Sequence, residues 1–160
     1  MRMRILAVSG LLAVSGCTNS VDGQAVEAHF WDPCTELSDE ALRAAGANPE
    51  TKRQSNFWKR WKICDWDIDP APYYLSIFST AYTMAYTRAN NDYIDRREIA
   101  LRGRPALLFN LASIPQGMCT VAFATAYGSL HVEVARPDDK GDACPLAVEK
   151  AEALAPYLPM

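Results

Sequence analysis

The chain contains five cysteines, and this number limits its possible folds more than any other feature of the sequence. They are Cys17, Cys34, Cys64, Cys119 and Cys144. Disulfides use cysteines in pairs, so an exported protein with five cysteines must give at least one of them another role. The residues that precede the first cysteine indicate what that role is.

Residues 1–16 have the pattern of a secretory leader. Arg2 and Arg4 form a positively charged start, and residues 5–14 form an uncharged, mostly apolar run. Such a run is too short to span a bilayer, which needs about 20 residues, but it is typical of a signal peptide. The segment that follows, Val14-Ser15-Gly16-Cys17, resembles a bacterial lipobox, in which the cysteine receives a lipid and becomes the new N-terminus.

We therefore expect residues 1–16 to be a lipoprotein signal peptide and Cys17 to carry the lipid. Residues 17–28 are polar and small and are predicted to form a tether, and residues 29–160 are predicted to form one domain. Two or three acyl chains, at about 0.8 kcal/mol per buried CH₂, would anchor the protein on the extracytoplasmic face of the cell membrane. An ordinary signal peptide that leaves Cys17 unmodified is the alternative.

Lipidation of Cys17 would leave four cysteines, which allow three disulfide pairings. Order along the chain favours Cys34–Cys64 and Cys119–Cys144, because each bond would then link a terminal helix to a strand of the core. Each would close a loop of about 25 to 30 residues, worth on the order of 3.5 kcal/mol of chain entropy. A zinc site is a poor alternative, because the sequence has no CxxC or CxxH pair.

The net charge argues against nucleic acid as a partner. The full chain has 16 Lys and Arg residues against 19 Asp and Glu residues, a net charge of −3. Loss of Arg2 and Arg4 with the leader leaves 14 against 19, a net charge of −5. Domains that bind nucleic acids need a basic face, so we expect none among the partners.

The spacing of apolar residues predicts two terminal helices. Ser38 can cap a helix that Gly46 ends, and Leu37, Leu42 and Ala45 form its buried stripe. A second helix is expected from Pro145 to the end of the chain. Its buried stripe is Ala147, Ala151, Leu154 and Leu158.

Between these helices, alternating side chains predict strands. We expect them at residues 61–69, 73–82, 98–101, 106–111, 118–126 and 130–135. In the first, Asp65, Asp67 and Asp69 lie opposite the buried Cys64, Trp66 and Ile68, and in the last, His131 and Glu133 face outward. Residues 47–60 are expected to be loop, and residues 83–92 a short helix or irregular loop. The prediction is an α+β fold: an antiparallel sheet of five to six strands, N- and C-terminal helices on one face, and two disulfides.

The segment Phe30-Trp31-Asp32-Pro33-Cys34, shortly after the lipobox, resembles a family of mycobacterial and other actinobacterial lipoproteins that is known only as a domain of unknown function. Further matching features are Cys64 beside Trp66, the segment Arg102-Gly103-Arg104-Pro105-Ala106, Cys119 within a strand and Cys144 before the last helix. The similarity covers most of residues 30–157. It implies a disulfide-linked α+β lipoprotein on the outer face of the membrane, and it implies no reaction or catalytic residue.

One segment is a candidate contact surface, because aromatic and basic side chains alternate along it: Phe57, Trp58, Lys59, Arg60 and Trp61. Such a segment could lie at an anionic membrane surface or stack on sugars of the cell wall. The alternative is that one or both tryptophans pack into the core while the cations stay hydrated.

No linear motif predicts catalysis, a metal site or a cofactor. The chain has two histidines, His29 and His131, and lacks a G-x-S-x-G motif. The D-x-D-x-D pattern that begins at Asp65 lacks the Gly and Glu of a calcium loop, since Pro70 and Ser76 occupy those positions. We therefore expect no cofactor, although a site assembled in space leaves no trace in the sequence.

The function expected from the sequence is a binding or interaction module that engages an envelope protein, a secretion component or a glycan. A carrier or chaperone for apolar envelope molecules is the alternative, and an enzyme is the third class. A large apolar cavity would favour the carrier. A flat patch around Trp58 and Trp61 would favour the interaction module, and a cleft that gathers His131 with acids of shifted pKa would favour the enzyme.

Overall fold

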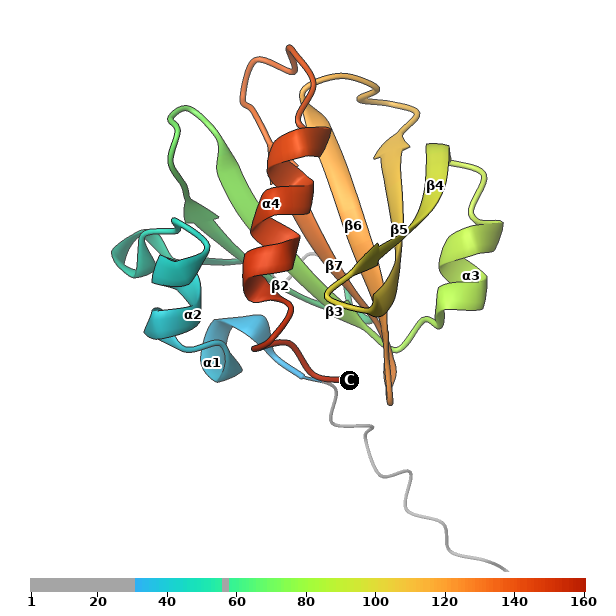
Figure 1. The fold of residues 1–160 in the computed structure, drawn as a ribbon, viewed down its shortest axis with the longest axis horizontal. Helices are drawn as coiled ribbons and strands as arrows, with labels where there is room; N and C mark the ends of the chain where they lie inside the picture. The colour runs from blue at the N-terminus through green and yellow to red at the C-terminus, as the bar shows by residue number, and fades with distance from the viewer. Residues whose placement is uncertain (1–30, 56–57) are drawn as a thin grey trace, which may run out of the picture.

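Seven strands form one antiparallel sheet, in the order β1-β2-β3-β7-β6-β5-β4 (Figure 1). The structure is a computed structural model that describes residues 31–55 and 58–160. Cys17, Phe57, the expected leader and the expected tether lie outside the described residues. The strands are β1 (Arg53–Ser55), β2 (Trp61–Asp67), β3 (Tyr74–Thr80), β4 (Tyr93–Leu101), β5 (Arg104–Leu111), β6 (Met118–Thr125) and β7 (Gly128–Ala135).

One long connection determines the strand order. After β3 the chain passes through helix α3 (Met84–Ala89) to β4 at the far edge of the sheet. From there β4, β5, β6 and β7 return strand by strand until β7 pairs with β3. Arg88 of α3 donates two hydrogen bonds to Glu98 of β4, at 2.7 and 3.2 Å, and these link the crossover helix to the edge strand.

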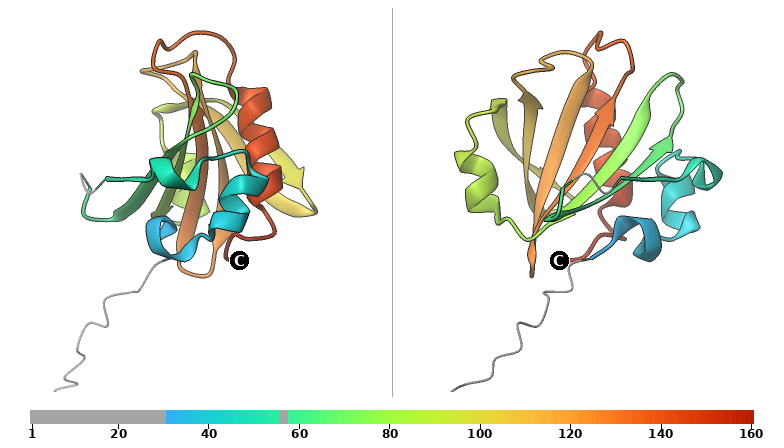
Figure 2. Two further views of the ribbon diagram at one scale, coloured as in Figure 1. Left: turned by 90° about the vertical axis from the view of Figure 1, so that its left-hand side faces the viewer. Right: turned by 180° about the vertical axis from the view of Figure 1, so that it is seen from behind.

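The helices at the two ends of the domain cover one face of the sheet. Helix α4 (Cys144–Leu154) packs on β6 and β7, α2 (Asp39–Ala44) packs against α4, and α1 (Pro33–Glu36) lies on β2. Viewed from behind, the sheet lies in front of α4 and α3 lies to one side (Figure 2). The predicted α+β class, with terminal helices on one face, is confirmed.

The main core lies between the sheet and these helices. Trp66, Leu75, Val121, Phe123 and Val132 are among its fully buried side chains. The predicted stripes are confirmed, because Leu37, Leu42 and Ala45 near α2 and Ala147, Ala151, Leu154 and Leu158 on and after α4 are all buried. Ser38 Oγ accepts a hydrogen bond from the Ala41 amide, as a helix cap should. Gly46 ends the helix region with a φ of +70°.

The Asp-Pro-Cys segment forms the start of α1. Asp32 Oδ1 accepts a hydrogen bond from the Cys34 amide at 3.0 Å, and Pro33 occupies the first turn of the helix. Cys34 is bonded to Cys64 in β2. The second bond joins Cys119 of β6 to Cys144 at the start of α4. Both predicted pairings are confirmed, and each links a terminal helix to a strand.

Residues 47–60 contain more structure than the predicted loop. The short helix η1 (Pro49–Thr51) is followed by β1, which pairs with β2 and raises the number of strands to seven. Arg53 and Gln54 of β1 are exposed, so this edge strand has no buried alternation that a sequence pattern could reveal. Strand β4 also begins at Tyr93, earlier than the predicted residue 98.

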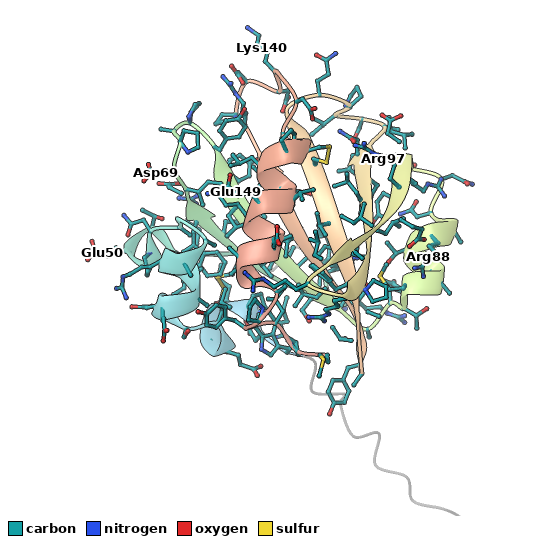
Figure 3. The ribbon with its side chains drawn as sticks, in the orientation of Figure 1. Glu50, Asp69, Arg88, Arg97, Lys140 and Glu149 are labelled. Atoms are coloured by element: carbon teal, nitrogen blue, oxygen red, sulfur yellow. A yellow bond between two sulfur atoms is a disulfide. The ribbon has the colours of Figure 1, made fainter. Side chains whose placement is uncertain are left out.

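Charged side chains lie around the periphery of the domain (Figure 3). Lys140 lies at the tip of the polar loop that connects β7 to α4, and Glu50 and Asp69 lie at the edge beside α2 (Figure 3).

Candidate ligand-binding groove

A groove of about 790 Å³ lies on the sheet face opposite α4. Its volume is within the range of small-molecule sites in proteins, which is roughly 300 to 1,000 Å³. Among the described residues, seven aromatic side chains line it: Trp58, Trp61, Phe78, Tyr82, Tyr86, Tyr93 and Phe109. Polar groups line it too, and they include Thr120, His131, Glu133, Asn90, Asp92, Lys59 and Arg60.

Strand pairing places these side chains on one face. Residues directly opposite each other in an antiparallel pair point to the same side of the sheet. Glu133 of β7 pairs with Ser76 of β3 and with Thr120 of β6, and Thr120 pairs with Phe109 of β5. These residues form a row across four strands. A neighbouring row contains His131, which pairs with Phe78.

Four aromatic rings form a chain along one side of the groove, which we call the aromatic ladder: Trp58, Trp61, Tyr82 and Tyr86. Successive ring centroids lie 6.4, 6.1 and 4.2 Å apart. The two end rings are 58% and 53% exposed, which leaves large aromatic surfaces open to solvent. The Arg60 guanidinium lies 5.7 Å from the centre of the Tyr82 ring.

His131 lies beneath the ladder and is surrounded by aromatic rings. Its ring centroid is 5.2 Å from that of Trp61, 5.8 Å from that of Phe109 and 6.4 Å from that of Tyr93. Its Nε2 lies 3.1 Å from Ser129 Oγ and 3.4 Å from Thr87 Oγ1. Burial lowers the pKa of His131 from 6.5 to about 3, so the imidazole is neutral at physiological pH.

Glu133 forms the centre of the groove floor and is 8% exposed. Thr120 Oγ1 donates a hydrogen bond to its Oε2 at 3.1 Å. Burial raises the pKa of Glu133 from 4.5 to about 7; the Thr120 hydrogen bond opposes this shift, and the nearby charge of Asp65 adds to it. The carboxyl group is therefore held between its acid and carboxylate forms at neutral pH.

His131 and Glu133, which were predicted to face outward, are buried. Both side chains do point away from α4, as the alternation of β7 predicts, but His131 is only 4% and Glu133 only 8% exposed. Rings from Trp61, Tyr93 and Phe109 surround His131, together with α3, whose Thr87 contacts it. A small apolar cluster of Met84, Leu107, Phe109 and Ala122 also packs there.

The candidate contact surface contributes one wall of the groove. Trp58 is exposed and Trp61 is half-buried against Phe78 and His131, while Lys59 and Arg60 are exposed beside them. The role of this segment as a contact surface stays a prediction. Tyr82, Tyr86, Tyr93, Phe109, Thr120 and Glu133 also line the groove and were not predicted as site residues. The available signal was the recurrence of aromatic residues at same-face positions of several strands.

The contact between Ser129 and His131 has the composition of a nucleophile and base pair. Ser129 is fully buried, however, and its hydroxyl also lies 3.5 Å from Thr87 Oγ1. These three polar groups satisfy one another beneath the aromatic rings and hold the imidazole in place. The accessible chemistry of the groove is therefore its aromatic surface and the carboxyl group of Glu133.

A family model described as protein of unknown function (DUF3558) matches residues 12–157. The chain belongs to this family. No curated protein and no solved structure matches this chain. The two disulfides of this DUF3558 protein indicate an extracytoplasmic location, because such bonds persist in oxidising compartments. None of the helices in residues 31–55 and 58–160 has the length and apolar character needed to cross a membrane.

Proposed function

We propose that this protein is a lipid-anchored binding module of the cell envelope that holds a small organic ligand, or a protruding group of a larger envelope component, in the aromatic groove. The lipobox-like segment that ends at Cys17 supports the anchor, and the disulfides support the compartment. The observation that carries the binding function is the groove itself: about 790 Å³, lined by seven aromatic rings, with a buried carboxyl group at its floor.

This arrangement favours binding for a physical reason. Exposed rings such as Trp58 and Tyr86 leave apolar surface in water, and covering that surface with a ligand is favourable. A concave aromatic surface with a few polar groups is the usual composition of a ligand site. A flat docking patch around Trp58 and Trp61 is not what the geometry favours, because both residues line a hollow.

A carrier for apolar envelope molecules is the second candidate, favoured by the volume and aromatic lining of the groove. The floor argues for a more restricted ligand. The Glu133 carboxyl group can accept further hydrogen bonds, and a purely apolar molecule would cover it without providing them. The ligand should therefore combine an apolar surface with a polar or charged group.

Native mass spectrometry of the protein purified from its own membranes tests the proposal. We expect a co-purified small molecule, and we expect Trp61→Ala and Tyr93→Ala to reduce its occupancy strongly, since each removes a ring from the groove. Tyr157→Ala serves as the control, because Tyr157 is an exposed aromatic residue outside the groove lining. Equal occupancy in all three variants would show that the ligand does not bind in the groove and would contradict the proposal.

A further inference from the structure

We infer that the groove selects an organic ammonium group, bound between the Glu133 carboxylate and the surrounding aromatic rings. The inference rests on the proposed binding function and specifies its ligand class. It depends on three observations: a buried acid, aromatic rings on both sides of it, and the distribution of charge around the groove.

The buried acid is the first observation. Glu133 lines the groove and is more than nine-tenths buried, and Thr120 is its hydrogen-bond partner among the described residues. A carboxylate has room for several hydrogen bonds or for an ionic partner. A buried carboxylate without a counter-charge is costly, and a cation that enters the groove would remove this cost.

The aromatic rings are the second observation. On one side of Glu133, beyond Thr120, Phe109 is stacked on Tyr93 with centroids 4.1 Å apart. On the other side lies Phe78, on the neighbouring strand and one row away, and it contacts Trp61. Aromatic faces attract cations, and the attraction is larger where water is excluded, as in the aromatic cages that bind quaternary ammonium groups.

The charge distribution is the third observation. Asp65 lies on the same face as Glu133, separated from it by Ser76, and it adds negative charge near the floor. The cations of the groove, Lys59 and Arg60, are on its exposed wall, where water and salt screen them, and Arg60 lies over the Tyr82 ring. Arg53 pairs with Asp65 at the edge of the sheet, but it is half exposed and forms an ion pair with Asp67. The charges nearest the buried part of the groove are therefore those of Glu133 and Asp65, and they favour a positive ligand.

A neutral sugar is the main competing ligand, because it could also stack on the aromatic ladder. It does not need a carboxylate, and its affinity should not depend on ligand charge. This difference allows a direct test with two molecules of nearly identical shape, choline and its neutral analogue 3,3-dimethyl-1-butanol.

The experiment titrates each compound into the full mature domain and measures affinity by calorimetry or tryptophan fluorescence. We expect choline to bind at least about tenfold more tightly than the neutral alcohol, because both the buried carboxylate and the aromatic rings attract its positive charge. Glu133→Gln should abolish this difference by weakening choline alone. Glu98→Gln is the matched control, since it removes an exposed carboxylate outside the groove and should change neither affinity.

Equal affinity for choline and the alcohol would overturn the inference, as would a choline preference that survives Glu133→Gln. If both compounds bind and Trp61→Ala weakens their affinities equally, the inference is also overturned. The proposed binding function would then still stand. If a neutral disaccharide binds more tightly than choline and Trp61→Ala abolishes that binding, the ligand class is a glycan and the inference is overturned. Absence of binding by all three compounds would overturn the inference, and the native mass spectrometry described above decides the proposed function separately.

Discussion

Thr120 and Glu133 face each other across β6 and β7, and Thr120 Oγ1 donates a 3.1 Å hydrogen bond to Glu133 Oε2. This hydrogen bond favours the carboxylate, whereas burial favours the neutral acid. Burial dominates, so the pKa of Glu133 rises from 4.5 to about 7. The balance between these two effects makes the stability of the domain depend on pH.

We expect Glu133 to destabilise the domain as the pH rises. Because its pKa is higher in the folded state, the folded protein binds this proton more tightly than the unfolded chain. The contribution of this bound proton to the free energy of unfolding is full below about pH 4.5 and is lost as the pH rises through about 7. The loss is on the order of 3 kcal/mol. Glu133→Gln should therefore be more stable than the wild type at pH 8, with the advantage absent at pH 4.5.

Urea unfolding at the two pH values measures this effect. Glu98→Gln is the control, because Glu98 is exposed and pairs with Arg88 at the surface. Wild type and Glu133→Gln curves that shift by the same amount between pH 4.5 and pH 8 would contradict the assignment.

His131 should have the opposite dependence on pH. Burial lowers its pKa from 6.5 to about 3, so its contribution to stability is present above about pH 6.5 and is lost as the pH falls through 3. The total loss is on the order of 5 kcal/mol. His131→Phe keeps an aromatic ring among Trp61, Tyr93 and Phe109 but cannot be protonated.

The measurement for His131 is the unfolding free energy at pH 7 and pH 3.5. The variant should lose less stability between these values than the wild type does, whatever its stability at pH 7. A larger acid-induced loss in His131→Phe would show that another group dominates in this range.

Each disulfide should contribute about 3.5 kcal/mol to stability, because the bonds span sequence separations of 30 and 25 residues. The double variants Cys34→Ala/Cys64→Ala and Cys119→Ala/Cys144→Ala test them separately in denaturant unfolding. Mass spectrometry with a thiol probe adds a direct check. Labelling of any of these four residues in native, non-reduced protein would contradict the pairing.

Arg104 should hold the end of the chain against the sheet. Its guanidinium donates hydrogen bonds to the carbonyl oxygens of Ala124 and Leu158, at 3.1 and 3.4 Å, and to that of Pro159. Arg104→Gln should speed amide hydrogen exchange in residues 155–160 and lower the unfolding free energy by about 2 kcal/mol. Arg43→Gln, which removes an exposed ion pair with Asp39, should leave the exchange of this segment unchanged.

Local signals in the sequence were sufficient where a feature depends on residues close in the chain. The cap at Ser38, the helix end at Gly46 and the alternation of Cys64, Trp66 and Ile68 all depend on neighbours within a few residues, and the structure has each of them. The order of the four cysteines along the chain was enough to favour the correct pairing among the three possible ones. The lipid anchor at Cys17 stays a prediction.

The tertiary structure alone decided which outward-facing residues are buried. The alternation of β7 determines that His131 and Glu133 share a face, but not whether water or other side chains cover it. That depends on partners far away in the chain, such as Thr87, which contacts His131 across 44 residues. The crossover through α3 starts the strands that carry Tyr93 and Phe109 at the far edge of the sheet, and their rings contact His131 of β7. A pattern that extends over a few residues cannot predict such contacts.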